Sequence, residues 1–88
     1  MSDAYEFTKR ALAQFQQLDP WLAEETLDEL EELIQNPPTS RLKSPAGAIH
    51  DFVRVHEGRR AYVFLTISSY PAREVFRVTT IGVHMVSS

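Results

Sequence analysis

The 88-residue sequence has no cysteine, only three glycines and no long apolar run. Without cysteine there is no disulfide framework, no thiolate nucleophile and no cysteine-ligated zinc site. No stretch approaches the roughly 18 apolar residues of a membrane-spanning helix. The three glycines are too few for a glycine-rich loop that cradles phosphates. The first ten residues lack the charged-then-apolar layout of a signal peptide, so we expect a cytoplasmic protein with no membrane partner.

The composition, 43% hydrophobic and 24% charged, is that of a folded globular chain, and the length provides for a single domain over residues 1–88. The net charge of −3 argues against a dedicated nucleic-acid binder, which is usually basic. The charge is uneven, however. Residues 1–35 hold nine acidic and two basic side chains, a net −7, whereas residues 36–88 hold seven basic and three acidic ones, a net +4. A basic second half leaves an RNA-facing surface open.

The first half of the sequence is typical of two helices. Residues 5–7 can form a short strand, and Thr8 is placed to begin a helix over residues 9–18, where apolar residues recur every three or four positions. Asp19-Pro20 predicts the start of a second helix, because aspartate caps helices through its carboxylate and proline suits the first helical position. Asn36-Pro37-Pro38 ends this helix and opens a loop that continues to residue 47.

The second half of the sequence is typical of three strands. From Ala48 apolar and polar residues alternate, and Glu57-Gly58 predicts a tight hairpin turn. Residues 60–68 follow as a central strand, and the segment from Ser69 to Ala72 predicts a second turn. A third strand covers residues 75–81, with Gly82 a candidate bulge or close approach. Helices followed by an antiparallel meander predict a two-layer α+β domain, with one sheet face on the helices and the other free for polar groups.

A basic and aromatic sheet face is the strongest candidate site. His50, Phe52, Arg54 and His56 share one side of the first strand, and Arg60, Tyr62 and Phe64 share one side of the next. If the hairpin aligns the two sets, arginines that hold phosphates lie beside aromatics that stack bases, as on a single-stranded RNA surface. The simpler interpretation, solvated strand residues with the phenylalanines buried, has the greater weight on pattern alone.

The histidines and the acidic run offer weaker signals. His50, His56 and His84 lack metal-ligand spacing, so we expect neither a metal nor a cofactor. His84 can act as a general acid or base near neutral pH, or can be an exposed histidine near the end of its strand. The run from Glu24 to Glu32 is more typical of a solvated helix face than of a cation site, and it can also dock a basic partner helix. No G-x-S-x-G nucleophile motif is present.

Four segments together carry a family resemblance: Tyr5-Glu-Phe with Ala11 and Phe15, Leu33 to Pro37, the hairpin of residues 53–64, and residues 76–84. On these segments the chain resembles the RelE/ParE superfamily of type II toxin–antitoxin toxins. The resemblance implies an α+β fold in which two N-terminal helices pack on a curved antiparallel sheet, made of a short N-terminal edge strand and a three-stranded meander. It also implies a cognate antitoxin that wraps an extended segment or helix around the domain.

The mRNA-cleaving members of that superfamily hold RNA at the ribosome with basic side chains and need no metal. The resemblance implies catalytic roles for Arg54, Arg60 and His84, and it places Tyr62 near an aromatic position of the family. The candidate binding residues of the basic second half are Phe52, Arg59, Tyr62 and Arg77. Phe52 and Val83 stand where strongly active members carry basic residues. The alternative is therefore a non-catalytic binding module, either an inhibitor of DNA gyrase or a degenerate toxin that only binds its antitoxin or another partner.

Overall fold

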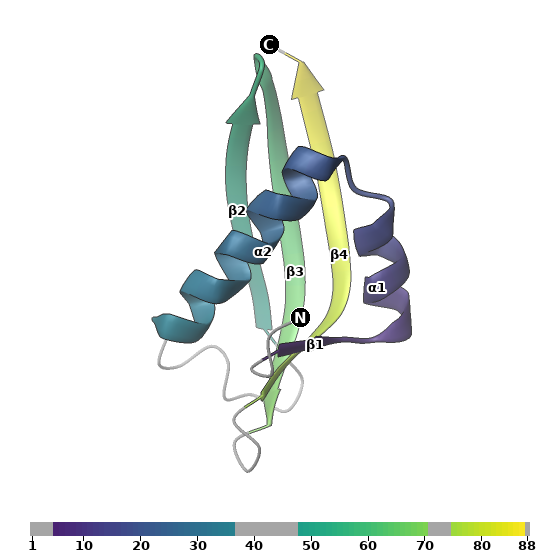
Figure 1. The fold of residues 1–88 in the computed structure, drawn as a ribbon, viewed down its shortest axis with the longest axis vertical. Helices are drawn as coiled ribbons and strands as arrows, with labels where there is room; N and C mark the ends of the chain where they lie inside the picture. Colours follow the sequence, from purple (N-terminus) through teal and green to yellow (C-terminus); the bar gives the residue numbers. More distant parts are fainter. Residues whose placement is uncertain (1–4, 37–47, 71–74, 88) are drawn as a thin grey trace.

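The computed structural model describes residues 5–36, 48–70 and 75–87. Its elements follow the order β1 (Tyr5–Phe7), α1 (Lys9–Gln16), α2 (Pro20–Gln35), β2 (Ala48–His56), β3 (Arg59–Tyr70) and β4 (Val75–Ser87) (Figure 1). The strands form one sheet in the order β1-β4-β3-β2. The meander β2–β3–β4 is antiparallel and β1 is an edge strand, as predicted; β1 runs parallel to β4, so the sheet is mixed.

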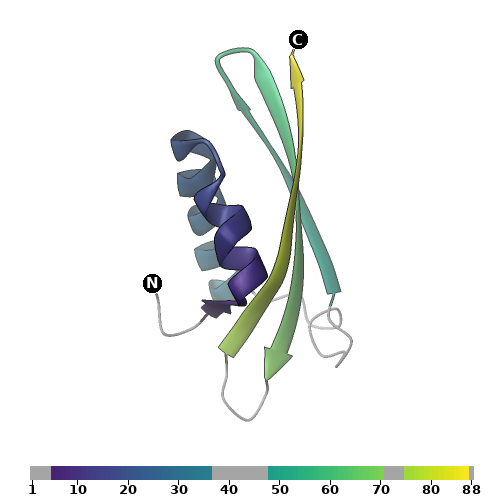
Figure 2. The same cartoon turned by 90° about the vertical axis from the view of Figure 1, so that its right-hand side faces the viewer.

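The molecule has two layers. Both helices lie against one face of the sheet, and no described element covers the other, which we call the open face (Figure 2). The core between the layers is apolar, with its largest fully buried side chains on α2 and the two central strands: Leu22, Leu30, Val63, Leu65, Ile67 and Val78. Burial of this continuous set of side chains is the main force holding the helices to the sheet.

Both helices begin where the sequence predicts, but by different means. Thr8 caps α1, since its hydroxyl accepts a hydrogen bond from the Ala11 amide at 3.2 Å. α1 ends at Gln16 rather than at residue 18. α2 begins at Pro20, yet the predicted side-chain cap from Asp19 is wrong. The Asp19 main-chain carbonyl accepts instead from the amides of Leu22 and Ala23, each at 2.9 Å. α2 ends at Gln35 as predicted, and residues 37–47 of the predicted loop lie outside the described residues.

The β2–β3 hairpin turns on two residues in the left-handed region. Glu57 has φ 51° and Gly58 has φ 77°, which is the geometry of a type I′ turn and confirms the predicted turn. The predicted second turn is wrong in its first half, because β3 continues through Ser69 to Tyr70; residues 71–74 lie outside the described residues. No helix in the described part of the chain is both long and apolar enough to cross a membrane.

A β-bulge interrupts the β3–β4 ladder at Thr79. Thr66 pairs with Thr80 and Ile67 with Val78, so Thr79 is the extra residue on β4. Its hydroxyl donates to the Thr66 carbonyl at 3.1 Å, and its carbonyl accepts from the Thr8 hydroxyl at 3.0 Å. Of the two alternatives predicted for Gly82, a bulge or a close approach, the bulge is wrong, because Gly82 pairs regularly with Phe64.

Candidate functional site on the open sheet face

The open face is a regular array of three strands and four rows. Alternate residues of a strand share a face, and paired residues of neighbouring strands lie side by side. Listed from β2 through β3 to β4, the rows are Val55–Arg60–Val86, Val53–Tyr62–His84, Asp51–Phe64–Gly82 and Ile49–Thr66–Thr80. The first row lies next to the hairpin turn. Titratable side chains therefore gather in the first three rows.

Arg60, Tyr62 and His84 form a polar cluster in the first two rows. An Arg60 guanidinium nitrogen donates to the Tyr62 hydroxyl at 3.3 Å. Tyr62 and His84 pair directly across β3 and β4, with ring centroids 6.2 Å apart and an interplanar angle of 40°. The hydrogen bond to Tyr62 and the electrostatic attraction of that group raise the pKa of Arg60 above its ordinary value. Arg60 is therefore a permanent cation beside a hydroxyl and an imidazole.

Arg54, Phe52 and Arg59 lie on the opposite, helix-covered face, so the predicted alignment of Arg54 and Phe52 with Arg60 and Tyr62 is wrong. The two-residue turn pairs Phe52 with Val63 and Arg54 with Ala61, both of which point into the core. Phe52 is buried and is not an exposed surface for stacking a base. The length of the turn predicts this pairing from the sequence alone. A two-residue turn pairs each even-numbered residue of β2 with an odd-numbered residue of β3, so Arg54 cannot share a face with Arg60.

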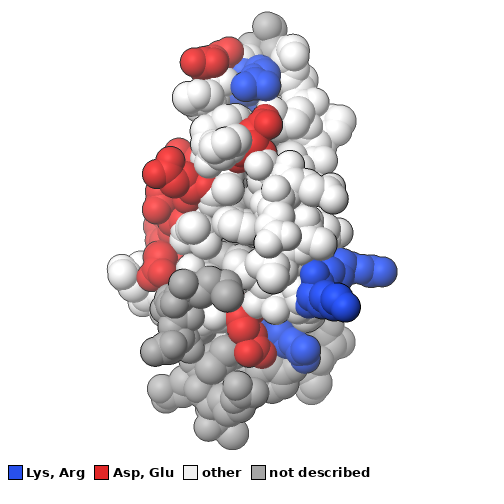
Figure 3. Space-filling view, turned by 45° about the vertical axis from the view of Figure 1, so that its right-hand side comes forward, with Lys and Arg blue, Asp and Glu red and all other residues white. Residues whose placement is uncertain are grey.

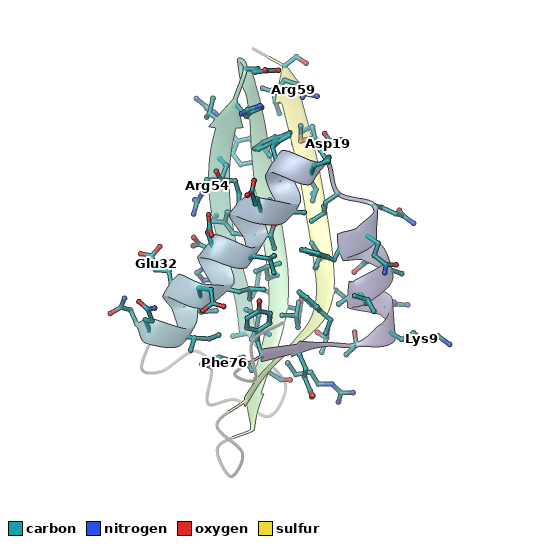
Figure 4. All side chains as sticks on the ribbon, viewed as in Figure 1. Lys9, Asp19, Glu32, Arg54, Arg59 and Phe76 are labelled. Atoms are coloured by element: carbon teal, nitrogen blue, oxygen red, sulfur yellow. The ribbon has the colours of Figure 1, made fainter. Side chains whose placement is uncertain are left out.

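Arg54 links β2 to the acidic side of α2. Its Nε donates to Glu25 at 2.9 Å and one terminal nitrogen donates to Glu29 at 2.6 Å, while the guanidinium lies 4.9 Å from the centre of the Phe52 ring. Glu29 also contacts His50 Nε2 at 3.1 Å. Partial burial lowers the pKa of Arg54, but the hydrogen bonds and charges of Glu29 and Glu25 outweigh it and raise that pKa overall. This arginine is engaged within the fold (Figure 4).

Near the hairpin turn, Arg59 and His56 also contact α2 rather than the open face. Arg59 lies 3.9 Å from the carboxylate of Asp19, and both side chains are labelled in Figure 4. The His56 ring stacks on Trp21, with centroids 4.9 Å apart and an interplanar angle of 20°. These contacts hold the N-terminal end of α2 to the hairpin, so Arg59 lies against Asp19 beside α2, whereas Arg60 bonds to Tyr62 on the open face.

The open face is more apolar than predicted. Ile49 and Val55 are each 64% exposed, and Val53 and Phe64 each 44%. Arg77, the remaining predicted binding residue, shares this face beyond the bulge, where it pairs with Ser68 and lies 3.8 Å from Glu6. Glu24, Asp28, Glu31 and Glu32 of α2 are exposed, and Figure 3 shows acidic side chains along one side of the molecule. Among the described residues, no three histidines or carboxylates are grouped to hold a metal ion.

A shallow groove runs between the α1–α2 junction and β4. Two adjoining hollows, each of about 230 Å³, are lined mainly by Gln17, Leu18, Leu22, Val83 and Met85. Gln14 closes part of this edge, since its side-chain oxygen accepts from the Ile81 amide at 2.7 Å. The groove has both apolar and polar lining, the polar part from Gln14, Gln17 and Asp19, and it lies on a different surface from the Arg60–Tyr62–His84 cluster.

Two helices on one face of a β1-β4-β3-β2 sheet, with the other face uncovered, define a two-layer α+β domain. It has the fold of the RelE toxin. A chain of the intact E. coli RelBE toxin–antitoxin complex superimposes with a TM-score of 0.64 and 20% identity, over 92% of this chain and 95% of that chain. The isolated E. coli RelE toxin in its P21 form gives 0.63 and 20% identity, over 92% and 83%. No protein-family model and no curated protein matches the sequence.

Proposed function

We propose that this chain is the toxin of a toxin–antitoxin pair and cleaves mRNA at the ribosome without a metal, using Arg60, Tyr62 and His84. One observation carries the proposal: a cation, a hydroxyl and an imidazole converge on the uncovered face of a RelE-like fold. This is the set of groups that phosphodiester cleavage by the neighbouring 2′-hydroxyl requires, since it needs a base, an acid and a stabiliser of negative charge.

Each residue has a role in the proposed reaction. His84 takes the proton of the 2′-hydroxyl as the 2′-oxygen attacks the phosphorus. The bond from phosphorus to the 5′-oxygen breaks, which leaves a 2′,3′-cyclic phosphate. Arg60 neutralises the charge that builds on the phosphate oxygens. Because the Tyr62 hydroxyl accepts from Arg60, its own proton points elsewhere and is donated to the departing 5′-oxygen.

Arg54 has no part in this reaction. Its guanidinium lies on the helix-covered face and bonds to Glu25 and Glu29. A phosphate on the open face would be separated from it by the sheet. Arg54 is therefore a structural residue in this proposal, and the active set is smaller than the resemblance implies.

Induced expression of matched variants tests the proposal. Arg60→Ala and His84→Ala should abolish growth inhibition and ribosome-dependent mRNA cleavage. Arg59→Ala should leave both intact, because Arg59 is the adjacent arginine on the opposite face. Full inhibition by His84→Ala, or equal loss in Arg59→Ala and Arg60→Ala, would contradict the assigned site.

A non-catalytic partner-binding module is the second candidate. The exposed apolar side chains of β2 favour it, since Ile49, Val53 and Val55 provide the kind of surface that proteins bury against one another. In this case growth inhibition would be unchanged in the His84→Ala variant, and DNA supercoiling rather than translation would change after induction.

We propose in either case an antitoxin partner whose apolar segment occupies the groove beside Val83 and Met85.

A further inference from the structure

The third row of the open face, Asp51–Phe64–Gly82, lies next to the proposed reaction site but has no role in it. Phe64 is 44% exposed and stands between Asp51 on β2 and Gly82 on β4. Phe64 is two positions along β3 from Tyr62, a distance of roughly 7 Å. A single nucleotide can span this distance, so a base can lie on this row while its phosphate lies beside Arg60 and Tyr62.

The row leaves space for a flat ring. A β-carbon added at Gly82 would have only the Phe64 Cβ and carbonyl oxygen within 4 Å, both at 4.0 Å. The position on β4 directly paired with Phe64 therefore carries no side chain, and a β-carbon there would meet only Phe64. Exposed aromatic rings stack unpaired bases, and such stacking contributes about 1–3 kcal/mol per base.

Asp51 supplies the polar edge of the row. Its carboxylate is exposed, forms no ion pair or hydrogen bond with the described residues, and is bordered by the apolar side chains of Ile49 and Val53. Directly paired residues place their β-carbons about 5 Å apart, so this carboxylate reaches the rim of anything stacked on Phe64. An ionised carboxylate only accepts hydrogen bonds and repels phosphate, so a base edge rich in donors is its natural partner.

We propose that this row is a base-binding subsite specific for guanine. Among the four bases, guanine alone presents two parallel donors on one edge, its N1–H and its N2 amino group, which match the two oxygens of a carboxylate. Adenine and cytosine present one amino donor beside a ring-nitrogen acceptor, and uracil presents one donor between two acceptors. The subsite rests on the proposed RNA-cleaving function, and it would determine next to which nucleotide the RNA is cleaved.

Binding of non-cleavable RNA tests the subsite separately from cleavage. The probes are four 2′-O-methyl hexamers, uridine throughout except for one central guanine, adenine, cytosine or uridine, and the readout is fluorescence anisotropy with the full chain. We expect the guanine hexamer to bind about tenfold more tightly than the adenine hexamer, as a bidentate base contact gives. The Gly82 amide resonance should shift on binding.

Three variants sharpen the test. Asp51→Asn should move the preference from guanine to adenine, because an amide offers one donor and one acceptor to match adenine. Phe64→Leu should weaken binding of all four hexamers about tenfold without changing their ranking. Asp28→Asn removes a carboxylate on α2, far from the row, and should change nothing.

The outcomes separate the two proposals. Equal affinity for the four hexamers, no measurable binding, or a preference unchanged in Asp51→Asn overturns the subsite. The reaction site would still stand if growth inhibition required His84. A guanine preference that depends on Asp51, in a protein whose inhibition does not require His84, would support the subsite and overturn the proposed cleavage. All three changes are at exposed positions, so circular dichroism should confirm intact folding.

Discussion

Arg54 and Arg60 lie on opposite faces of one hairpin, because Arg54 pairs with Ala61 in the β2–β3 ladder while Arg60 pairs with Val55. Arg54 bonds to two carboxylates of α2, and Arg60 bonds to the Tyr62 hydroxyl on the open face. The two arginines therefore differ in what they stabilise. Replacing the first should affect folding, and replacing the second should affect function.

Arg54→Ala should lower the free energy of unfolding by about 1–3 kcal/mol. The change leaves the carboxylate of Glu29, whose side chain is only 14% exposed, without the arginine that is its nearest charged partner. Arg60→Ala, at an exposed side chain, should leave the urea midpoint unchanged. Urea unfolding of both variants followed by circular dichroism measures the difference. Equal midpoints for the two variants would show that the Arg54 contacts do not hold α2 to β2.

The contribution of the Arg54 contacts should be insensitive to arginine deprotonation at neutral pH. Folding raises the pKa of Arg54, so the stabilisation is fully present below the ordinary pKa of arginine and is lost only as the pH rises through the still higher pKa of the folded state. The difference in unfolding free energy between the parent and Arg54→Ala should therefore be constant from neutral to mildly alkaline pH. A steady decline over that range, measured by urea unfolding, would point to another titrating group.

Thr8→Ala should destabilise the fold by about 1–2 kcal/mol, because one hydroxyl both caps α1 and donates to the carbonyl of the bulge residue Thr79. Thr8→Ser keeps that hydroxyl and serves as the matched control, with a much smaller loss. Thermal unfolding of the two variants checks this. Similar losses in both would assign the effect to the threonine methyl group instead.

Glu57→Asn should stabilise the hairpin by about 0.5–1 kcal/mol, because Glu57 has φ 51° and asparagine adopts the left-handed region more readily than glutamate. The contact of Glu57 with His56, at 3.8 Å and well exposed, contributes little that would be lost. Gly58→Ala should act in the opposite direction, since Gly58 has φ 77°. Thermal midpoints that shift in the same direction for both changes would contradict this account of the turn.

Gly82→Ala should fold at least as stably as the parent, with a gain of up to about 1 kcal/mol, because glycine in a strand costs backbone entropy. A β-carbon there meets only Phe64, at an ordinary contact distance of 4.0 Å. Urea unfolding measures the change. A clear loss of stability would show that β3 and β4 approach more closely at this position.

The sequence predicted the elements well, because their signals are local. Thr8, Pro20 and Asn36 mark helix ends through capping and the restrictions of proline, and Glu57-Gly58 marks the hairpin. The β1 edge position was implied by the family resemblance and is confirmed. The parallel direction of β1 was not predicted, since it depends on where α1 and α2 return the chain.

The candidate site was predicted less well, because it depends on pairing between strands. Sharing one side of a strand does not determine which residues of the next strand lie beside it, and Arg54 was placed with Arg60 for that reason. The position of the bulge also has a local signal, the spacing of two apolar residues on β4, and this signal points to Thr79 rather than to Gly82. Val78 and Ile81 are both buried yet three positions apart, so the alternation of buried and exposed residues must change between them, at Thr79 rather than at Gly82.

The extra residue at Thr79 divides β4 into two segments, in which residues of opposite numbering, even before it and odd after it, face the helices. Before it, even-numbered Phe76 and Val78 face the helices; after it, Ile81, Val83 and Met85 do, which leaves His84 on the open face. Removing this one residue would exchange Met85 and His84 between the faces without touching either. A single inserted residue five positions before His84 thus decides whether this end of the strand presents an imidazole or a thioether on the open face.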